Sequence, residues 1–86
     1  MKTKLNLVED ISDVVNPGDA MSLDCSDHLG LVWCCPECGA LTSTANGHKH
    51  VFDPKTHSLQ PSIVHNIKLG GCGWHGWLRN GIFINV

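Results

Sequence analysis

The sequence lacks the features of a membrane protein and of a secreted protein. Its 86 residues contain no apolar stretch approaching the ~20 residues that a transmembrane helix needs. The charged start, Met1–Lys4, is not followed by the apolar run of a signal peptide. We therefore expect a protein that does not enter a membrane and resides in the cytoplasm.

A strong charge of either sign is also missing. The net charge is −2, and the six Lys and Arg residues are scattered along the chain. Nucleic-acid-binding surfaces usually appear as basic clusters or stripes. The composition therefore argues against a nucleic-acid partner, and the chain is not acidic enough to imitate DNA.

Cysteine and histidine are plentiful, with five and six residues respectively. The odd number of cysteines and the missing signal peptide argue against a disulfide framework. A chain of this length buries too little surface to be very stable, and a bound metal is one common remedy. We expect reduced cysteines, some of which bind a metal.

Two short motifs supply the expected metal ligands. The first holds Cys35 and Cys38 in a Cys-Pro-Glu-Cys-Gly turn, and the second holds Cys72 and His75 in a Cys-Gly-Trp-His turn. Two ligands three residues apart on a turn can reach one ion, and two such pairs complete a tetrahedron. We predict that Cys35, Cys38, Cys72 and His75 bind one structural Zn²⁺, with iron as the alternative metal.

Other cysteines and histidines leave alternatives open. Cys34 precedes Cys35 and is expected to be a small buried hydrophobe, although it could replace a named ligand. His50 is the natural substitute in the second pair. Cys25 and His28 have the same spacing and could form a second site with His48 or His50, but an exposed loop is the preferred interpretation.

A catalytic metal would need an open coordination position and a nearby general base. Glu37 is the only acid beside the cluster, and we expect its side chain to point to solvent. His57 and His65 have no paired neighbour and are expected at the surface or in hydrogen bonds. Because three thiolates and an imidazole fill a tetrahedral site, we predict a structural metal.

The secondary-structure signals are those of short strands joined by tight turns. Strands are expected at Leu5–Val8 and Gly30–Cys34. The sequence Asn16–Asp19 predicts a type II turn, which would close a hairpin between Val14–Val15 and the segment that follows. Asn80–Gly81, between apolar β-formers, predicts a type I′ hairpin.

These signals predict an all-β, zinc-ribbon-like domain of short antiparallel strands and hairpins. We expect a single domain over residues 1–86, with a β-hairpin region at 1–24 and the zinc-ribbon-like core at 30–86. At least two of Trp33, Trp74 and Trp77 are expected in the core rather than on a stacking surface.

Four segments between Cys35 and Phe83 carry a family resemblance. They are Cys35–Gly39, His50–Phe52, Gln60–Ile63 and Cys72–Gly81. The chain resembles the small zinc-binding proteins of unknown function common in tailed-phage and prophage genomes, some of which are labelled ammonia monooxygenase. Such monooxygenases are membrane copper proteins, and this chain has neither a span nor a histidine-dominated copper site.

The resemblance implies a phage-encoded accessory protein in the host cytoplasm. With a full ligand set and no candidate base, we predict a non-enzymatic protein that binds another protein, modulating a host enzyme or defence system. The alternatives are a nucleic-acid-binding zinc ribbon and a zinc-dependent hydrolase that uses Glu37.

Overall fold

The computed structural model describes residues 2–44 and 50–86, in which all regular structure is short strands and 3₁₀ turns. The elements are β1 (Lys2–Lys4), β2 (Asn6–Leu7), η1 (Ile11–Asp13), β3 (Asp19–Asp24), β4 (Leu29–Cys34), β5 (Leu41–Ser43), β6 (Val51–Asp53), β7 (Ser58–Val64), η2 (Ile67–Leu69), β8 (His75–Arg79) and β9 (Ile82–Asn85). The all-β class predicted from the sequence is confirmed. Within these two ranges, no helix has the length and apolarity to cross a bilayer.

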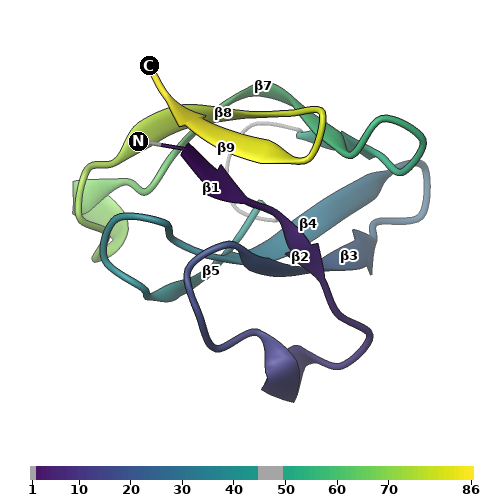
Figure 1. The fold of residues 1–86 in the computed structure, drawn as a ribbon, viewed down its shortest axis with the longest axis horizontal. Helices are drawn as coiled ribbons and strands as arrows, with labels where there is room; N and C mark the ends of the chain where they lie inside the picture. Colours follow the sequence, from purple (N-terminus) through teal and green to yellow (C-terminus); the bar gives the residue numbers. More distant parts are fainter. Residues whose placement is uncertain (1, 45–49) are drawn as a thin grey trace.

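The strands form two sheets that lie one above the other (Figure 1). One sheet has the order β1-β9-β8-β7-β6 and the other β2-β3-β4-β5. All neighbours are antiparallel except β2 and β3, which are parallel. Because β1 and β2 follow each other directly, the start of the chain contributes one edge strand to each sheet.

The hairpin at the end of the chain forms as the sequence predicts. Asn80 and Gly81 have φ values of 50° and 77°, and they connect the cross-strand pair Arg79 and Ile82. Positive φ at both central residues is the mark of a type I′ turn. Its twist matches that of the flanking strands, so β8 and β9 pair without splaying.

The turn at Asn16–Asp19 also forms, but it does not close the expected hairpin. Gly18 has φ 95°, and the Asp19 N–H donates to the Asn16 carbonyl at 2.9 Å. Val14 and Val15 lie outside any strand, because η1 occupies the segment before them. Instead, Asn6 of β2 lies beside Asp19 in a parallel pair.

The core lies between the sheets and centres on aromatic rings. Trp33 of β4 is 2% exposed, and its ring centroid lies 5.8 Å from that of Trp74 and 6.0 Å from that of Phe83. Trp77 is half-buried on the outer face of its sheet. Two of the three tryptophans therefore belong to the core, as predicted. The remaining buried members are Leu5, Ala20, Leu31, Cys35, Phe52, Leu59, Ile63 and Leu78.

Two leucines of different burial provide a test of this packing. Leu78 is fully buried and Leu41 is 53% exposed. We expect Leu78→Ala to lower the free energy of unfolding by roughly 2–5 kcal/mol through lost burial and a residual cavity. Leu41→Ala should change it by less than about 0.5 kcal/mol. Urea unfolding of both variants in zinc-containing buffer measures the difference, and equal losses would contradict the described core.

Candidate metal centre and serine–histidine pair

A tight turn after β4 presents the first two thiols. The Cys35 N–H donates to the Ala40 carbonyl, and the Gly39 N–H donates to the Cys35 carbonyl, both at 2.9 Å. Gly39 has φ 78°, a left-handed conformation that glycine adopts without strain. The closed turn brings the Cys38 side chain to the same side as that of Cys35.

A second loop, between β7 and β8, presents the other two donors. Its base is closed by the His65 N–H, which donates to the Trp74 carbonyl at 2.8 Å, and by the Gly73 N–H, which donates to the His65 carbonyl at 2.7 Å. A Cβ atom on Gly71 would lie 2.3 Å from that same carbonyl oxygen. Only glycine fits there, and the close approach brings Cys72 next to His65.

Cys35, Cys38, His65 and Cys72 meet in one cluster, with their donor atoms all within 4.8 Å of one another. The Sγ atoms of Cys35 and Cys72 are 3.7 Å apart. The Nδ1 atom of His65 lies 3.3 Å from the Cys38 Sγ and 3.5 Å from the Cys72 Sγ. Tetrahedral zinc, with Zn–S ~2.3 Å and Zn–N ~2.0 Å, requires about 3.8 Å between sulfurs and about 3.5 Å between sulfur and nitrogen. The cluster fits a tetrahedral metal site.

The electrostatics of the two knuckle thiols differ. Burial raises the pKa of the Cys35 thiol to about 12. The main-chain N–H of Ala40 lowers the pKa of the exposed Cys38 thiol. A divalent cation that displaces the thiol protons would compensate the buried negative charge at Cys35.

Three of the four predicted ligands are brought together, and the fourth position is taken by His65 rather than His75. His65 is 8% exposed, and its ring packs edge-on against Trp33, with the two ring centroids 6.0 Å apart. Trp74 immediately precedes β8, and adjacent side chains at a strand end point to opposite sides. Trp74 therefore turns into the core, whereas His75 is exposed and points away from the cluster.

The other candidate ligands lie apart from this cluster. Cys34 is 1% exposed, and its thiol donates to the Gly39 carbonyl at 3.0 Å, in keeping with the predicted buried role. Cys25 and His28 join no group of three metal donors within the described ranges, and His48, their other expected partner, lies outside those ranges. His28 instead contacts Asp27, and Glu37 is exposed.

A serine and a histidine meet on the outer face of the five-stranded sheet. The Nε2 atom of His75 lies 3.0 Å from the Oγ atom of Ser62. The two residues belong to adjacent antiparallel strands, β8 and β7, where a bulge places residues 60–62 opposite the single Trp77. An unprotonated Nε2 can accept the hydroxyl proton, which is how a general base activates a serine nucleophile.

His50 also lies at this position. Its Nε2 atom is 3.0 Å from the main-chain carbonyl oxygen of Ser62, and a protonated Nε2 donates to that oxygen. The residue held in reserve as a metal ligand is therefore near the serine and outside the metal cluster. Its hydrogen bond fixes the main chain within the bulge.

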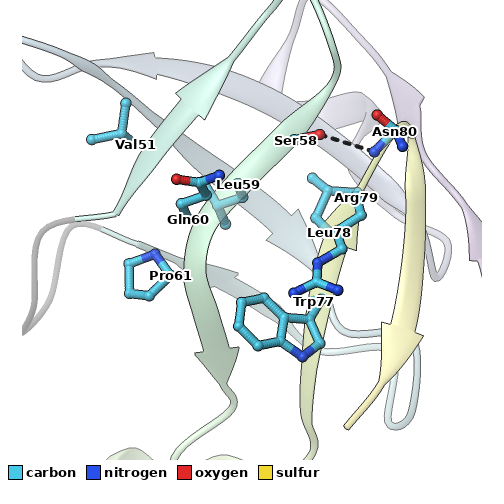
Figure 2. A pocket seen from close by; sticks show the side chains of 9 residues that line it. All are labelled: Val51, Ser58, Leu59, Gln60, Pro61, Trp77, Leu78, Arg79 and Asn80. Carbon is cyan, nitrogen blue, oxygen red and sulfur yellow. Dashed lines mark hydrogen bonds between the residues drawn. The ribbon is translucent and has the colours of Figure 1, made fainter.

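A groove of about 650 Å³ lies beside the serine–histidine pair. Figure 2 shows Gln60 and Pro61 on the β7 side and Trp77 and Arg79 on the β8 side. The Asn80 N–H donates to the Ser58 Oγ at 2.9 Å and ties the end of the groove together (Figure 2). The lining residues are Val51, Ser58, Leu59, Gln60, Pro61, Trp77, Leu78, Arg79 and Asn80.

Comparison with known proteins relates the chain to a protein family. The family model described as the bacterial ubiquitination-like system serine protease (BubE) matches residues 7–86, so the chain belongs to this family. No curated protein and no solved structure matches the chain. The family description points toward an enzyme, whereas the sequence alone favoured a non-enzymatic protein. The family description names a bacterial system, and the phage origin expected from the sequence stays a prediction.

Sequence reasoning missed both Ser62 and His65. Ser62 lies in one of the segments that carried the resemblance, and His75 lies in another, but nothing in either segment indicates that they pair. His65 precedes Cys72 by seven residues, a separation outside the short knuckle spacings. The loop that brings them together depends on Gly71, so a glycine-rich stretch between a histidine and a cysteine was the only available signal.

The metal cluster leads to a test that separates His65 from His75. We expect one zinc ion per chain and a similar zinc affinity in His75→Ala. His65→Ala should weaken zinc binding by at least about 10- to 100-fold, the loss that removal of even an outer-shell partner causes. Competition with a chromogenic chelator measures both affinities.

His65→Cys serves as the matched control, because a four-thiolate set also suits zinc. We expect this variant to recover most of the affinity that His65→Ala loses. Loss of zinc in His75→Ala but not in His65→Ala would instead support the ligand set predicted from the sequence.

Proposed function

We propose that this protein is a serine peptidase in which Ser62 is the nucleophile and His75 is its general base. The observation that carries the proposal is the 3.0 Å contact between the His75 Nε2 and the Ser62 Oγ on an accessible sheet face. Membership of a family described as a serine protease supports it. Nucleophile and base within hydrogen-bond reach are the signature of such chemistry.

The pair would perform acyl transfer in two halves. The Ser62 Oγ attacks the carbonyl carbon of the scissile bond while its proton passes to the His75 Nε2. That proton then goes to the departing amine as the bond to carbon breaks, leaving an acyl group on Ser62. Water attacks this ester with His75 again accepting the proton, and the acid product leaves as Ser62 regains its hydrogen.

Two features hold Ser62 in place for this reaction. The bulge in β7 sets it beside His75 on the outer face, and the hydrogen bond from His50 fixes its carbonyl group. Bulges often redirect a side chain next to an active site. Restricting the nucleophile to a reactive geometry lowers the entropic part of the barrier.

In the same proposal, Cys35, Cys38, His65 and Cys72 hold zinc with a structural role. Zinc there would supply cross-linking and charge balance rather than a bound hydroxide. Ser62 lies three residues before His65, and His75 lies three residues after Cys72. The same loop and the strand ends that flank it therefore carry both metal donors and the serine–histidine pair.

We propose a polypeptide of a bacterial ubiquitination-like system as both substrate and partner. The protein partner expected from the sequence would then be the molecule that is cleaved, rather than one whose activity is modulated. We place the reaction in the cytoplasm, since all five cysteines are unpaired and reduced thiols belong to that compartment.

An activity-based probe tests the nucleophile without knowledge of the substrate. A small neutral fluorophosphonate adds to an activated serine with loss of fluoride, and intact-mass spectrometry counts the adducts. We expect one adduct per chain, located on Ser62, and none in Ser62→Ala. His75→Gln should slow labelling by about 100-fold or more, because a general base contributes roughly 10²- to 10⁴-fold.

Ser22→Ala and His28→Gln are the matched controls, since both residues lie in or beside the other sheet, away from the pair. Each should label at the rate of the unchanged protein. An adduct on a different serine, or equal labelling of His75→Gln, would exclude the proposed pair.

Because the β7–β8 loop carries metal donors and its flanking strands carry Ser62 and His75, we predict that a bound metal holds this pair in position. After zinc is stripped by a chelator, labelling of Ser62 should fall at least about 10-fold and recover when zinc is restored, because the ends of β7 and β8 lose their fixed separation. In the reverse direction, Ser62→Ala should bind zinc unchanged. Labelling that is unaffected in stripped protein, with its circular dichroism preserved, would contradict this coupling.

A further inference from the structure

The groove beside Ser62 carries one charged residue. Of the residues that line it, only Arg79 bears a charge, and the others are apolar or neutral. Within the described ranges, no carboxylate forms an ion pair with Arg79, since the ion pair found there joins His28 and Asp27. The Arg79 guanidinium is therefore free to bind a group brought by a ligand.

The position of this guanidinium is set by Trp77. Its central carbon lies 4.0 Å from the centroid of the Trp77 ring, a cation–π contact. Figure 2 shows the arginine side chain extended along β8 toward that ring. A stacked guanidinium loses little further freedom on binding, and its free edge presents N–H donors in a fixed plane.

The groove also lies in line with the proposed nucleophile. Pro61 of its β7 wall is adjacent to Ser62, and Trp77 of its β8 wall lies two residues from His75. A strand advances about 3.3 Å per residue. An extended polypeptide with its scissile carbonyl at Ser62 would therefore place its next one to three residues over the groove.

Resting on the proposed peptidase function, we infer that this groove is a specificity site for an acidic side chain of the substrate, bound by Arg79. The planar fork of arginine matches a carboxylate in a two-point hydrogen bond. The exposed apolar side chains of Val51 and Pro61 in the groove wall would contact the methylene groups of a glutamate. Arg79 is thus a specificity-determining residue that takes no part in bond cleavage.

Reactive peptides test this site directly. The probes are acetylated tripeptide diphenyl phosphonates with glycine throughout, except for one Glu or one Gln at the second or third residue from phosphorus. We expect the Glu probes to inactivate the zinc-loaded protein about 5-fold faster or more than the Gln probes of equal size. The preference should shrink at high salt, which screens a partly exposed ion pair.

Variants assign the preference to Arg79. Arg79→Gln should react equally with Glu and Gln probes, and Arg79→Glu should favour a Lys probe instead. Arg79→Lys keeps the charge but loses the planar fork, so an intermediate preference is expected. Lys55→Gln, which removes an exposed cation outside the groove, is the matched control and should keep the full preference.

Equal rates for Glu and Gln probes, with the neutral fluorophosphonate still labelling Ser62, would overturn this inference and leave the peptidase proposal intact. A Glu preference that survives in Arg79→Gln would also overturn it. If no phosphonate of any kind labels Ser62, the peptidase proposal and the inference are both excluded.

Discussion

The four-donor cluster is the constraint on which the rest of this structure depends, because its members come from both sheets. Cys35 and Cys38 follow β4 of the four-stranded sheet, whereas His65 and Cys72 lie in the β7–β8 loop of the five-stranded sheet. A single ion at this point would cross-link two layers that otherwise meet through a small aromatic core. For a chain of 86 residues, such a link is a substantial part of the free energy of folding.

The same loop connects the metal cluster to the proposed chemistry. Its two ends lead directly into Ser62 and His75, which face outward from the strands whose continuations hold His65 and Cys72. This arrangement places two proposed tasks, metal binding and catalysis, at neighbouring positions of the β7–β8 hairpin. The four metal donors, of which Cys35 and His65 are buried and Cys38 and Cys72 are exposed, form a complete tetrahedral set. The outer sheet face carries the proposed nucleophile, its proposed base and an adjoining groove. Under the proposed function, a fully coordinated metal is compatible with catalysis, because the metal would not need to take part in the reaction.

The groove runs along the outer face of the sheet, beside the serine–histidine pair. It is lined from Pro61, the residue before Ser62, to Asn80, with the stacked pair Trp77 and Arg79 along one wall. In the proposed binding mode, a substrate chain that follows β7 and β8 would contact the apolar side chains of Val51 and Pro61 and the positive charge of Arg79. Recognition in this form depends on main-chain direction and one charged contact, which suits an extended, acidic segment of a polypeptide.

Much of the architecture follows from local sequence, since its causes are local. Asn80–Gly81 determines a type I′ turn through positive φ, Gly18 determines the turn before β3, and the Cys-Pro-Glu-Cys-Gly motif determines the first knuckle. The second half of the site was beyond such reasoning. Whether His65 or His75 joins the cluster depends on where β8 begins, because a shift of one residue exchanges the inner and outer faces. The pairing of Ser62 with His75 depends on a bulge that changes the register between two strands. The sequence by itself determined the all-β class, the turns and three of the four clustered donors. Only the tertiary structure decided that His65 joins the three cysteines and that Ser62 lies beside His75. Both outcomes depend on the register between strands, and that register is set by packing between segments far apart in the chain.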